Sequence, residues 1–312
     1  MNKLIVSSSP HIRHADTTQR IMLDVVIALM IPAIAGTIIY GLGALFVIIT
    51  CILASVLSEF IFNIATKKPQ TVGDLSAVVT GLILALNLRA DAPLWQCAIG
   101  SVFAIVVVKC LFGGLGANFA NPAAAARVFL LICFAGTLAG GKAPDFSSAP
   151  ELVSGATPLT VIANGGKLPS ITDMLLGLRG GAIGESCIIA IVIGFIYLVA
   201  RRVIHFETPI AFVATVFVLS LIVDNSFTTA TYQILSGGLV FGAVFMATDY
   251  VSTPITRSGK VLFAIGCGLI TFLIRYFGSY PEGVSFSILF MNILSPYIEK
   301  WTAPRALGGK KA

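Results

Sequence analysis

Long apolar runs alternate with short polar breaks along this chain. Most of the runs are close to the roughly 20 residues that a helix needs to cross a hydrocarbon core about 30 Å thick. Gly, Pro, Asn or charged residues bound each of them. The pattern predicts an all-α integral membrane protein with ten transmembrane helices. The expected spans are 21–40, 43–65, 75–88, 94–112, 122–138, 183–200, 209–223, 235–248, 261–277 and 284–298.

Composition supports a membrane protein and excludes a soluble globular domain. The 312 residues are 57% hydrophobic and 11% charged, with a mean hydropathy of +0.96. Ordinary soluble domains carry about 25% charged residues. The net charge of +6 is spread over short basic pairs at the ends of apolar runs, and this spread argues against a nucleic-acid-binding face.

The basic residues also predict how the chain is oriented in a plasma membrane. With the N-terminus inside, thirteen Lys and Arg residues lie in cytoplasmic segments and four lie outside: Arg89, Lys142, Lys167 and Arg179. Both termini are then cytoplasmic, and the long break between the fifth and sixth spans is external. The first 20 residues lack the apolar stretch of a cleaved signal peptide, so we expect the N-terminus to be retained.

The two halves of the chain resemble each other at offsets of about 160 to 166 residues. Leu75-Ser76 is echoed by Leu235-Ser236, and Lys109 by Arg275. Because each half has an odd number of spans, such a repeat is inverted in the membrane; chance similarity between apolar helices is the alternative. The expected organisation is an N-terminal cytoplasmic segment 1–20, a five-helix repeat 21–138, an external loop 139–179, a second five-helix repeat 180–299 and a C-terminal tail 300–312.

The third and eighth spans are short and occupy corresponding places in the two halves. Paired short helices of this kind often line a central binding site in membrane proteins, although tilted packing is an alternative. Carboxylates inside spans are costly in lipid and suggest functional sites, and this makes Asp24 and Glu59 candidates for ion coupling. For Asp24 the alternative is a pair with Arg20 four residues earlier. Glu185 and Asp249 are expected near helix ends, in contact with water or backbone N–H groups.

Cysteine and histidine give no sign of a metal site. The six cysteines lie in or beside apolar runs and no two are close in sequence, so apolar packing is their expected role. The three histidines lie outside the expected spans, and we therefore expect no haem.

A short motif of small and hydroxyl residues in the external loop carries the strongest chemical signal. Ser154-Gly155-Ala156-Thr157 is followed by Pro158, which favours an extended backbone at Thr157. An acidic residue, Glu151, stands three positions before the serine. This motif resembles the flavin-attachment sequence of the NqrB/RnfD family of membrane redox subunits, in which aspartate is usual at the acidic position.

The resemblance extends over nearly the whole chain and concerns several further stretches. These are Thr17 to Asp24, Gly73 to Asn87, Gly113 to Ala123, Gly181 to Glu185, Met246 to Asp249, Tyr280 to Gly283 and Met291-Asn292. It implies that a flavin transferase joins FMN through a phosphoester to the hydroxyl of Thr157.

The resemblance also implies a noncovalent riboflavin near the glycine-rich segment that precedes the fifth span. Asn118 and Asn121 offer amides there that suit an isoalloxazine edge. A simpler role for Asn121 is to cap the fifth helix, with Pro122 at its first position.

The implied function is that of a flavoprotein subunit in an ion-translocating ferredoxin:NAD+ oxidoreductase of the Rnf type. It would relay electrons across the membrane, coupled to export of Na+ or H+, with no complete active site in this chain alone. Its expected partners are other membrane and peripheral subunits, bearing iron–sulfur centres and flavins, and the lipid bilayer. A small-solute channel or transporter of urea-channel-like fold is the alternative, and a purely structural scaffold is a third interpretation.

Overall fold

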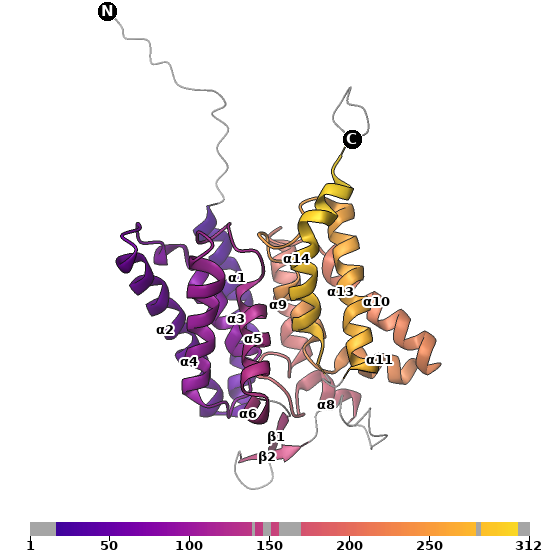
Figure 1. Cartoon of the computed structure of the whole chain (residues 1–312). Helices are drawn as coiled ribbons and strands as arrows, with labels where there is room; N and C mark the ends of the chain where they lie inside the picture. The colour runs from indigo at the N-terminus through magenta and orange to yellow at the C-terminus, as the bar shows by residue number, and fades with distance from the viewer. Residues whose placement is uncertain (1–16, 139–140, 146–150, 156–169, 279–281, 305–312) are drawn as a thin grey trace, which may run out of the picture.

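Two groups of helices stand side by side in the computed structural model, one from each half of the chain (Figure 1). The structure describes residues 17–138, 141–145, 151–155, 170–278 and 282–304. The helix α1 begins and α14 ends at the same end of the bundle, which we call the termini face (Figure 1). The β1–β2 hairpin lies at the opposite end, the hairpin face.

The first group contains five long or short α-helical units and the 3-10 helix η1, and α4 continues directly into the π-helical segment η2. Their bounds are α1 Thr18–Tyr40, α2 Leu42–Ala65, η1 Val72–Asp74, α3 Ser76–Leu86, α4 Leu94–Val102, η2 Phe103–Cys110 and α5 Pro122–Cys133.

The second group follows the hairpin segment and contains one helix that is broken in the middle. Between the groups lie α6 Ala135–Leu138, β1 Gly141–Asp145, β2 Glu151–Gly155 and α8 Ile171–Leu176. The second group consists of α9 Ile188–Ala200, α10 Glu207–Asp224, α11 Phe227–Leu235, α12 Leu239–Phe241, the π-helical η3 Gly242–Met246, α13 Arg257–Phe277 and α14 Val284–Thr302.

Apolar side chains cover the outside of the long helices. Ile34 and Ile38 of α1 are 54% and 75% exposed, and Leu42 and Leu53 of α2 are 69% and 55% exposed. Among the described residues, α1, α2, α10 and α13 are long and apolar enough to cross a bilayer, and the pair α11 with α12–η3, bent by 62°, makes a fifth candidate. These features are those of a membrane protein, in which lipid replaces water around the apolar surface.

The short helix α3 lies in the core of the first group. Its residues from Thr80 to Leu86 are all buried, as expected for a helix that is apolar on every side. The two groups are joined by packing of α1 against α9 and of α5 against α14. Close approach at these contacts depends on small residues: a Cβ on Gly194 of α9 would lie 3.0 Å from the carbonyl oxygen of Ala28 in α1.

Several expected boundaries are wrong in informative ways. The sixth helix begins at Ile188 instead of 183, because the preceding segment is tied to the end of α3 by bonds from Ile183 N to Leu88 O (2.9 Å) and from Gly184 N to Leu86 O (2.8 Å). The eighth span was expected to begin at residue 235, which is where α11 ends. The prediction from sequence therefore missed both α11 and the break at 236–238.

The described residues are helical apart from one short β-hairpin, which lies in the loop that the sequence predicts to be external. Strands β1 and β2 pair antiparallel, with Gly141 opposite Gly155 and Asp145 opposite Glu151. The fifth span ends at Cys133, where Phe134 interrupts the helix before the short α6. The ten-span arrangement as a whole stays a prediction.

Candidate functional site

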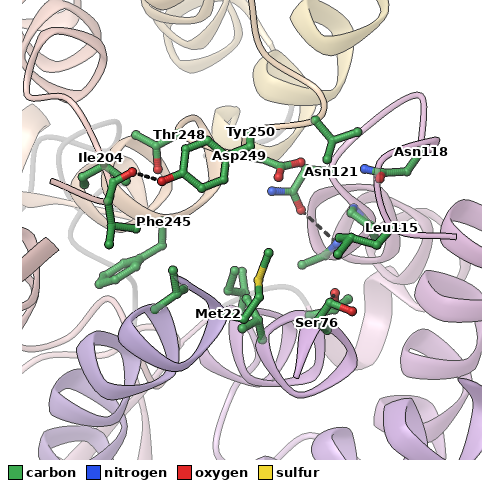
Figure 2. Close-up of a pocket in the computed structure, with 18 of the residues that line it drawn as sticks. Met22, Ser76, Leu115, Asn118, Asn121, Ile204, Phe245, Thr248, Asp249 and Tyr250 are labelled. Carbon is green, nitrogen blue, oxygen red and sulfur yellow. Dashed lines mark hydrogen bonds between the residues drawn. The ribbon is translucent and has the colours of Figure 1, made fainter. Parts of the chain in front are cut away.

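A cavity lined by residues of both helix groups opens near the termini face (Figure 2). The space between its lining atoms amounts to about 780 Å³, which includes a part open to solvent. Met22 and Phe245 lie on one side of the cavity, and Asn121, Thr248 and Asp249 lie on the other (Figure 2). The cavity therefore offers a flat apolar ligand a surface to pack on and a polar edge to orient it.

Both asparagines of the glycine-rich segment line this cavity, where Figure 2 shows them on the same side. Asn118 is buried and donates from Nδ2 to the carbonyl oxygen of Ala120 at 2.9 Å. Asn121 caps α5: its Oδ1 accepts from the backbone nitrogens of Ala123 (3.0 Å) and Ala124 (3.2 Å). The capping role expected for Asn121 is thus confirmed, and the flavin contact stays a prediction for both residues.

Asn121 also joins the two halves of the chain. Its Nδ2 donates to the carbonyl oxygen of Met246 at 3.2 Å, at the end of η3. The segment that follows η3 brings Thr248, Asp249 and Tyr250 to the cavity (Figure 2). Burial raises the pKa of the Asp249 carboxyl above its usual range, although hydrogen bonds from Ser252 and neighbouring backbone N–H groups oppose this.

A buried ion pair forms part of the cavity wall. Lys109 Nζ donates to both carboxylate oxygens of Glu59, at 3.0 and 2.9 Å, and to Ser76 Oγ at 2.6 Å. Each charged side chain is 2% exposed, and Thr71 Oγ1 donates to Glu59 at 2.6 Å. The sequence identified Glu59 as an isolated carboxylate and did not find its partner, because the two residues are 50 positions apart.

Asp24 lies near the start of α1, at the end of the helix that is predicted to face the cytoplasm. Its carboxylate has a partner in the other helix group. Arg201 Nη2 lies 3.2 Å from Asp24 Oδ2, and the Tyr197 hydroxyl donates to Oδ1 at 2.8 Å. These contacts come from the end of α9 and the residue after it. They account for the carboxylate as a link between the two helix groups, and no contact that the structure describes assigns it an ion-coupling role.

The Ser154-Gly155-Ala156-Thr157 motif, which is predicted to attach flavin, is divided by the limit of the described residues. Ser154 and Gly155 belong to β2, opposite Lys142 and Gly141 of β1. Ala156 and Thr157 lie outside the described residues. Because β2 lies at the hairpin face (Figure 1), the start of the motif lies there as well.

Near the hairpin face, two carboxylates meet at the break between α11 and α12. A Cβ on Gly238 would lie 3.1 Å from both Glu185 Oε2 and Glu282 Oε1. Gly238 N donates to Glu282 Oε1 at 2.8 Å, and Ala182 N donates to Glu185 Oε1 at 2.7 Å. The backbone contact expected for Glu185 is confirmed, whereas its proximity to Glu282 was not predicted.

Burial and the neighbouring charge of Glu282 raise the pKa of Glu185 to about 8. Burial acts in the same direction on Glu282, but Arg127 and the hydrogen bond from Glu185 outweigh it and lower the pKa of Glu282. The pair therefore holds one proton at neutral pH.

Comparison with known proteins decides the family. The model of the NQR2, RnfD, RnfE family matches residues 5–308. The chain belongs to that family.

Known members of the NQR2, RnfD, RnfE family are similar to the chain over nearly its full length. The D-type subunit of the Na(+)-translocating ferredoxin:NAD(+) oxidoreductase complex of Acetobacterium woodii is 45% identical, covering 99% of this chain and 96% of the relative. The proton-translocating counterpart of Clostridium ljungdahlii is 38% identical, covering 99% and 98%. The D-type subunit of the ion-translocating oxidoreductase complex of Stutzerimonas stutzeri is 35% identical, covering 94% and 92%. These relatives are subunits of ion-translocating oxidoreductase complexes, and the resemblance inferred from the motifs is confirmed.

Proposed function

We propose that this chain is the D-type membrane subunit of an ion-translocating ferredoxin:NAD+ oxidoreductase. The observation that carries the proposal is the 45% identity over 99% of the chain to a subunit of that name. One relative is named for Na+ and another for protons, so the similarity supports redox-driven ion export without selecting the ion.

Within this function, the chain crosses the membrane ten times as two inverted repeats with both termini in the cytoplasm. Two contacts support the repeat. Lys109 Nζ donates to Ser76 Oγ at the start of α3 (2.6 Å), and the echo residue Arg275 donates to the carbonyl oxygen of Ser236 just before α12 (3.1 Å).

Thr157 carries FMN through a phosphoester in this proposal. Support comes from the Ser-Gly-Ala-Thr motif, from its strand β2 at the hairpin face, and from the basic-residue bias that assigns this face to the outside. Only a hydroxyl side chain can form such an ester, and bound flavin would supply one- and two-electron transfer at this position.

A second, noncovalent flavin of the riboflavin type occupies the cavity of Figure 2. The residues suit an uncharged ring system: the apolar side chains of Met22 and Phe245 lie across the cavity from Asn121. The one lysine that lines the cavity has its charge neutralised by Glu59, so the site has no free cation for a phosphate group among the described lining residues. Asn118 and Asn121 would orient the ring edge, because each amide keeps hydrogen-bonding capacity beyond the bonds it makes within the protein.

The covalent flavin is tested by replacing the attachment hydroxyl. Membranes from cells with the flavin transferase are denatured, separated on a gel and viewed under ultraviolet light. The wild-type band should fluoresce and Thr157→Ala should not. Thr160→Ala removes a neighbouring threonine hydroxyl and serves as the matched control that keeps the fluorescence. Fluorescence that survives in Thr157→Ala would refute the assignment.

The electron-relay function is distinguished from the two rival interpretations by measurements on the assembled complex. Thr157→Ala should abolish ferredoxin-dependent NAD+ reduction, whereas a structural scaffold predicts unchanged turnover. A solute channel predicts that the isolated chain conducts a small solute in proteoliposomes and carries no flavin. Either result would overturn the proposal, and ion flux with Na+ and protonophore controls would identify the ion.

A further inference from the structure

A second cavity lies beside the one shown in Figure 2. The Tyr250 hydroxyl donates to the carbonyl oxygen of Val203, and both residues line both cavities, so this contact forms part of the wall between them. The space between the lining atoms of the second cavity amounts to about 490 Å³, which includes a part open to solvent. Because Lys260 and His205 are among its lining residues, we call it the basic cavity.

The positive charge of the basic cavity is not balanced by its own lining. The side chains of Lys260 and His205 have no hydrogen-bond or ion-pair partner in the part of the chain that the structure describes. No carboxylate is among the described lining residues. Glu207, close to the cavity in sequence, lies 3.6 Å from Arg257 in an ion pair, and Asp249 lines the other cavity. An anion that enters the basic cavity therefore meets an ammonium group that no described carboxylate neutralises.

A buried hydroxyl of the basic cavity also lacks a partner. Thr208 is 3% exposed and lines the cavity, and its hydroxyl makes no hydrogen bond to any residue that the structure describes. The other two threonines of the lining are satisfied, since Thr248 donates to the carbonyl oxygen of Val244 at 2.6 Å and Thr253 donates to that of Asp249. Buried hydroxyl groups are usually paired, because otherwise they lose water without gaining a partner. The Thr208 hydroxyl therefore indicates a ligand that accepts a hydrogen bond.

Two long helices begin at the basic cavity. The helix α10 begins at Glu207, and no side chain caps this start; Thr208 is its second residue. The helix α13 begins at Arg257, two residues after Ile255 of the lining, and contributes Lys260 from its first turn. Backbone N–H groups at a helix start carry partial positive charge and favour anions. The uncapped start of α10 therefore adds donors beside the unpaired hydroxyl.

Exposed aromatic side chains indicate that the basic cavity lies at the level of lipid headgroups. Tyr250 of the lining is 49% exposed, and Trp301 near the end of α14 is 75% exposed. The next residue, Thr302, shares a hydroxyl–hydroxyl bond of 2.7 Å with Thr256, which caps α13. The start of α13 and the end of α14 therefore meet at the termini face. Trp and Tyr are enriched where a membrane meets water, so this face lies at an interface.

Exposed apolar side chains adjoin the basic cavity on the same two helices. Ile255 lines the cavity and is 76% exposed. Ile210 near the start of α10 and Leu262 near the start of α13 are 54% and 41% exposed, and the two helices pack against each other. A ligand in the cavity can therefore have a charged group among polar donors and an apolar part on the surface of the bundle. Phospholipids have this division.

We propose that the basic cavity binds the phosphate group of an anionic phospholipid. Lys260 supplies the opposite charge, and the Thr208 hydroxyl donates to a phosphate oxygen together with the start of α10. The acyl chains lie over Ile255 and the exposed apolar side chains of α10 and α13. Basic pockets between helices on the cytoplasmic side suit such headgroups, and the basic residues of the sequence predict that side for the termini face. Free phosphate has the same chemistry as the headgroup and is the competing source.

The first test follows the thermal unfolding midpoint of the full chain in the uncharged detergent dodecyl maltoside while dioleoylphosphatidylglycerol is added. Wild type should gain about 2 °C at ten times the dissociation constant. Dioleoylphosphatidylcholine has the same acyl chains and no net charge, and it should require a much higher concentration for the same gain. Inorganic phosphate at constant ionic strength should give no gain over the same concentration range, because it has no acyl chains to bind the apolar surface.

Variants of the lining show whether the basic cavity is the site. Lys260→Gln should raise the half-maximal lipid concentration about fivefold, the effect expected for one lysine beside an anionic headgroup, and Lys260→Arg should keep most of the affinity. Thr208→Val keeps the shape of the side chain and should raise that concentration severalfold, because a hydrogen bond to a charged group is lost. Lys300→Gln removes a lysine from the last turn of α14 that does not line the cavity, and this matched control should behave as wild type.

The outcomes separate the site from the source of its ligand. Equal half-maximal concentrations in wild type, Lys260→Gln and Thr208→Val overturn the site. An equal gain with phosphatidylcholine overturns the preference for an anionic lipid, and a gain with inorganic phosphate that Lys260→Gln abolishes overturns the lipid as the source. The midpoint of each variant without lipid shows whether it folds, and Thr208→Val decides the matter if Lys260→Gln does not fold. Flavin attachment does not enter the readout, so the result is independent of the proposed function.

Discussion

Removal of Lys109 should destabilise the protein strongly, because it leaves the charge of Glu59 buried. Glu59 and Lys109 are each 2% exposed and joined by two bonds of 3.0 and 2.9 Å. In Lys109→Met the carboxylate keeps the bond from Thr71 and loses both bonds from the ammonium group. Breaking one side of such a buried pair costs about 3–5 kcal/mol. With an unfolding entropy of about 2.1 cal/mol/K per residue, the chain loses about 5–8 °C in its unfolding midpoint.

The assay is thermal unfolding of the full chain in nanodiscs, followed by intrinsic fluorescence. The double variant Glu59→Gln/Lys109→Met removes both charges and should recover most of the loss, since an uncharged replacement of a buried pair is often neutral or stabilising. Arg201→Met is the matched control: it breaks the pair with Asp24, in which Arg201 is 57% exposed, and should cost no more than about 1 kcal/mol.

Two results would refute this reasoning. A midpoint for Lys109→Met within about 1 °C of wild type would mean, by the same entropy argument, that less than about 1 kcal/mol depends on the pair. The second result is a double variant whose drop in unfolding midpoint equals the sum of the drops in Glu59→Gln and Lys109→Met. It would mean that the two side chains act independently.

Three further predictions concern stability. Gly184→Ala should lower the unfolding midpoint, because the added Cβ would lie 2.5 Å from Leu86 Cβ and 3.1 Å from its carbonyl oxygen; an unchanged midpoint would contradict the close packing. Asn121→Ala removes two bonds to the start of α5 and should cost about 0.5–2 kcal/mol, while Asn121→Ser should restore part of it. Wild-type stability should fall as the pH rises from about 5 to 8. In this range the folded state keeps the proton of Glu185, whose pKa is about 8, while the unfolded carboxyl has lost it near its ordinary pKa of 4.5. The lowered pKa of Glu282 acts in the opposite sense and only below that window; Glu185→Gln should flatten the decline, and an identical pH profile in this variant would refute the assignment.

The apolar runs predicted most of the helices, but not the places where the chain departs from regular helix. They placed α1, α2, α10 and α13 within a few residues of their observed bounds, because a span in lipid must be apolar and its length is fixed by the bilayer. The break before α12 was missed, since Ser236-Gly237-Gly238 is flanked by apolar residues on both sides. Its stability depends on Glu282, whose carboxylate accepts from Gly238 N across the fold.

Some features of the candidate sites could likewise be predicted from sequence, and others could not. The motif around Thr157 and the segment from Asn118 to Asn121 were found from sequence, because local residue types carry their chemistry. The partners of Glu59 and Glu185 were not, because Lys109 and Glu282 are 50 and nearly 100 positions away.

By itself, the sequence determined the membrane class, the family resemblance and the residue types available for flavin attachment. These properties depend on composition and on short motifs, which do not require knowledge of distant contacts. The tertiary structure decided which charges neutralise one another and where the cavity lies. Each of these depends on side chains from separate helices meeting in a low-dielectric interior, where one missing partner has a large energetic consequence.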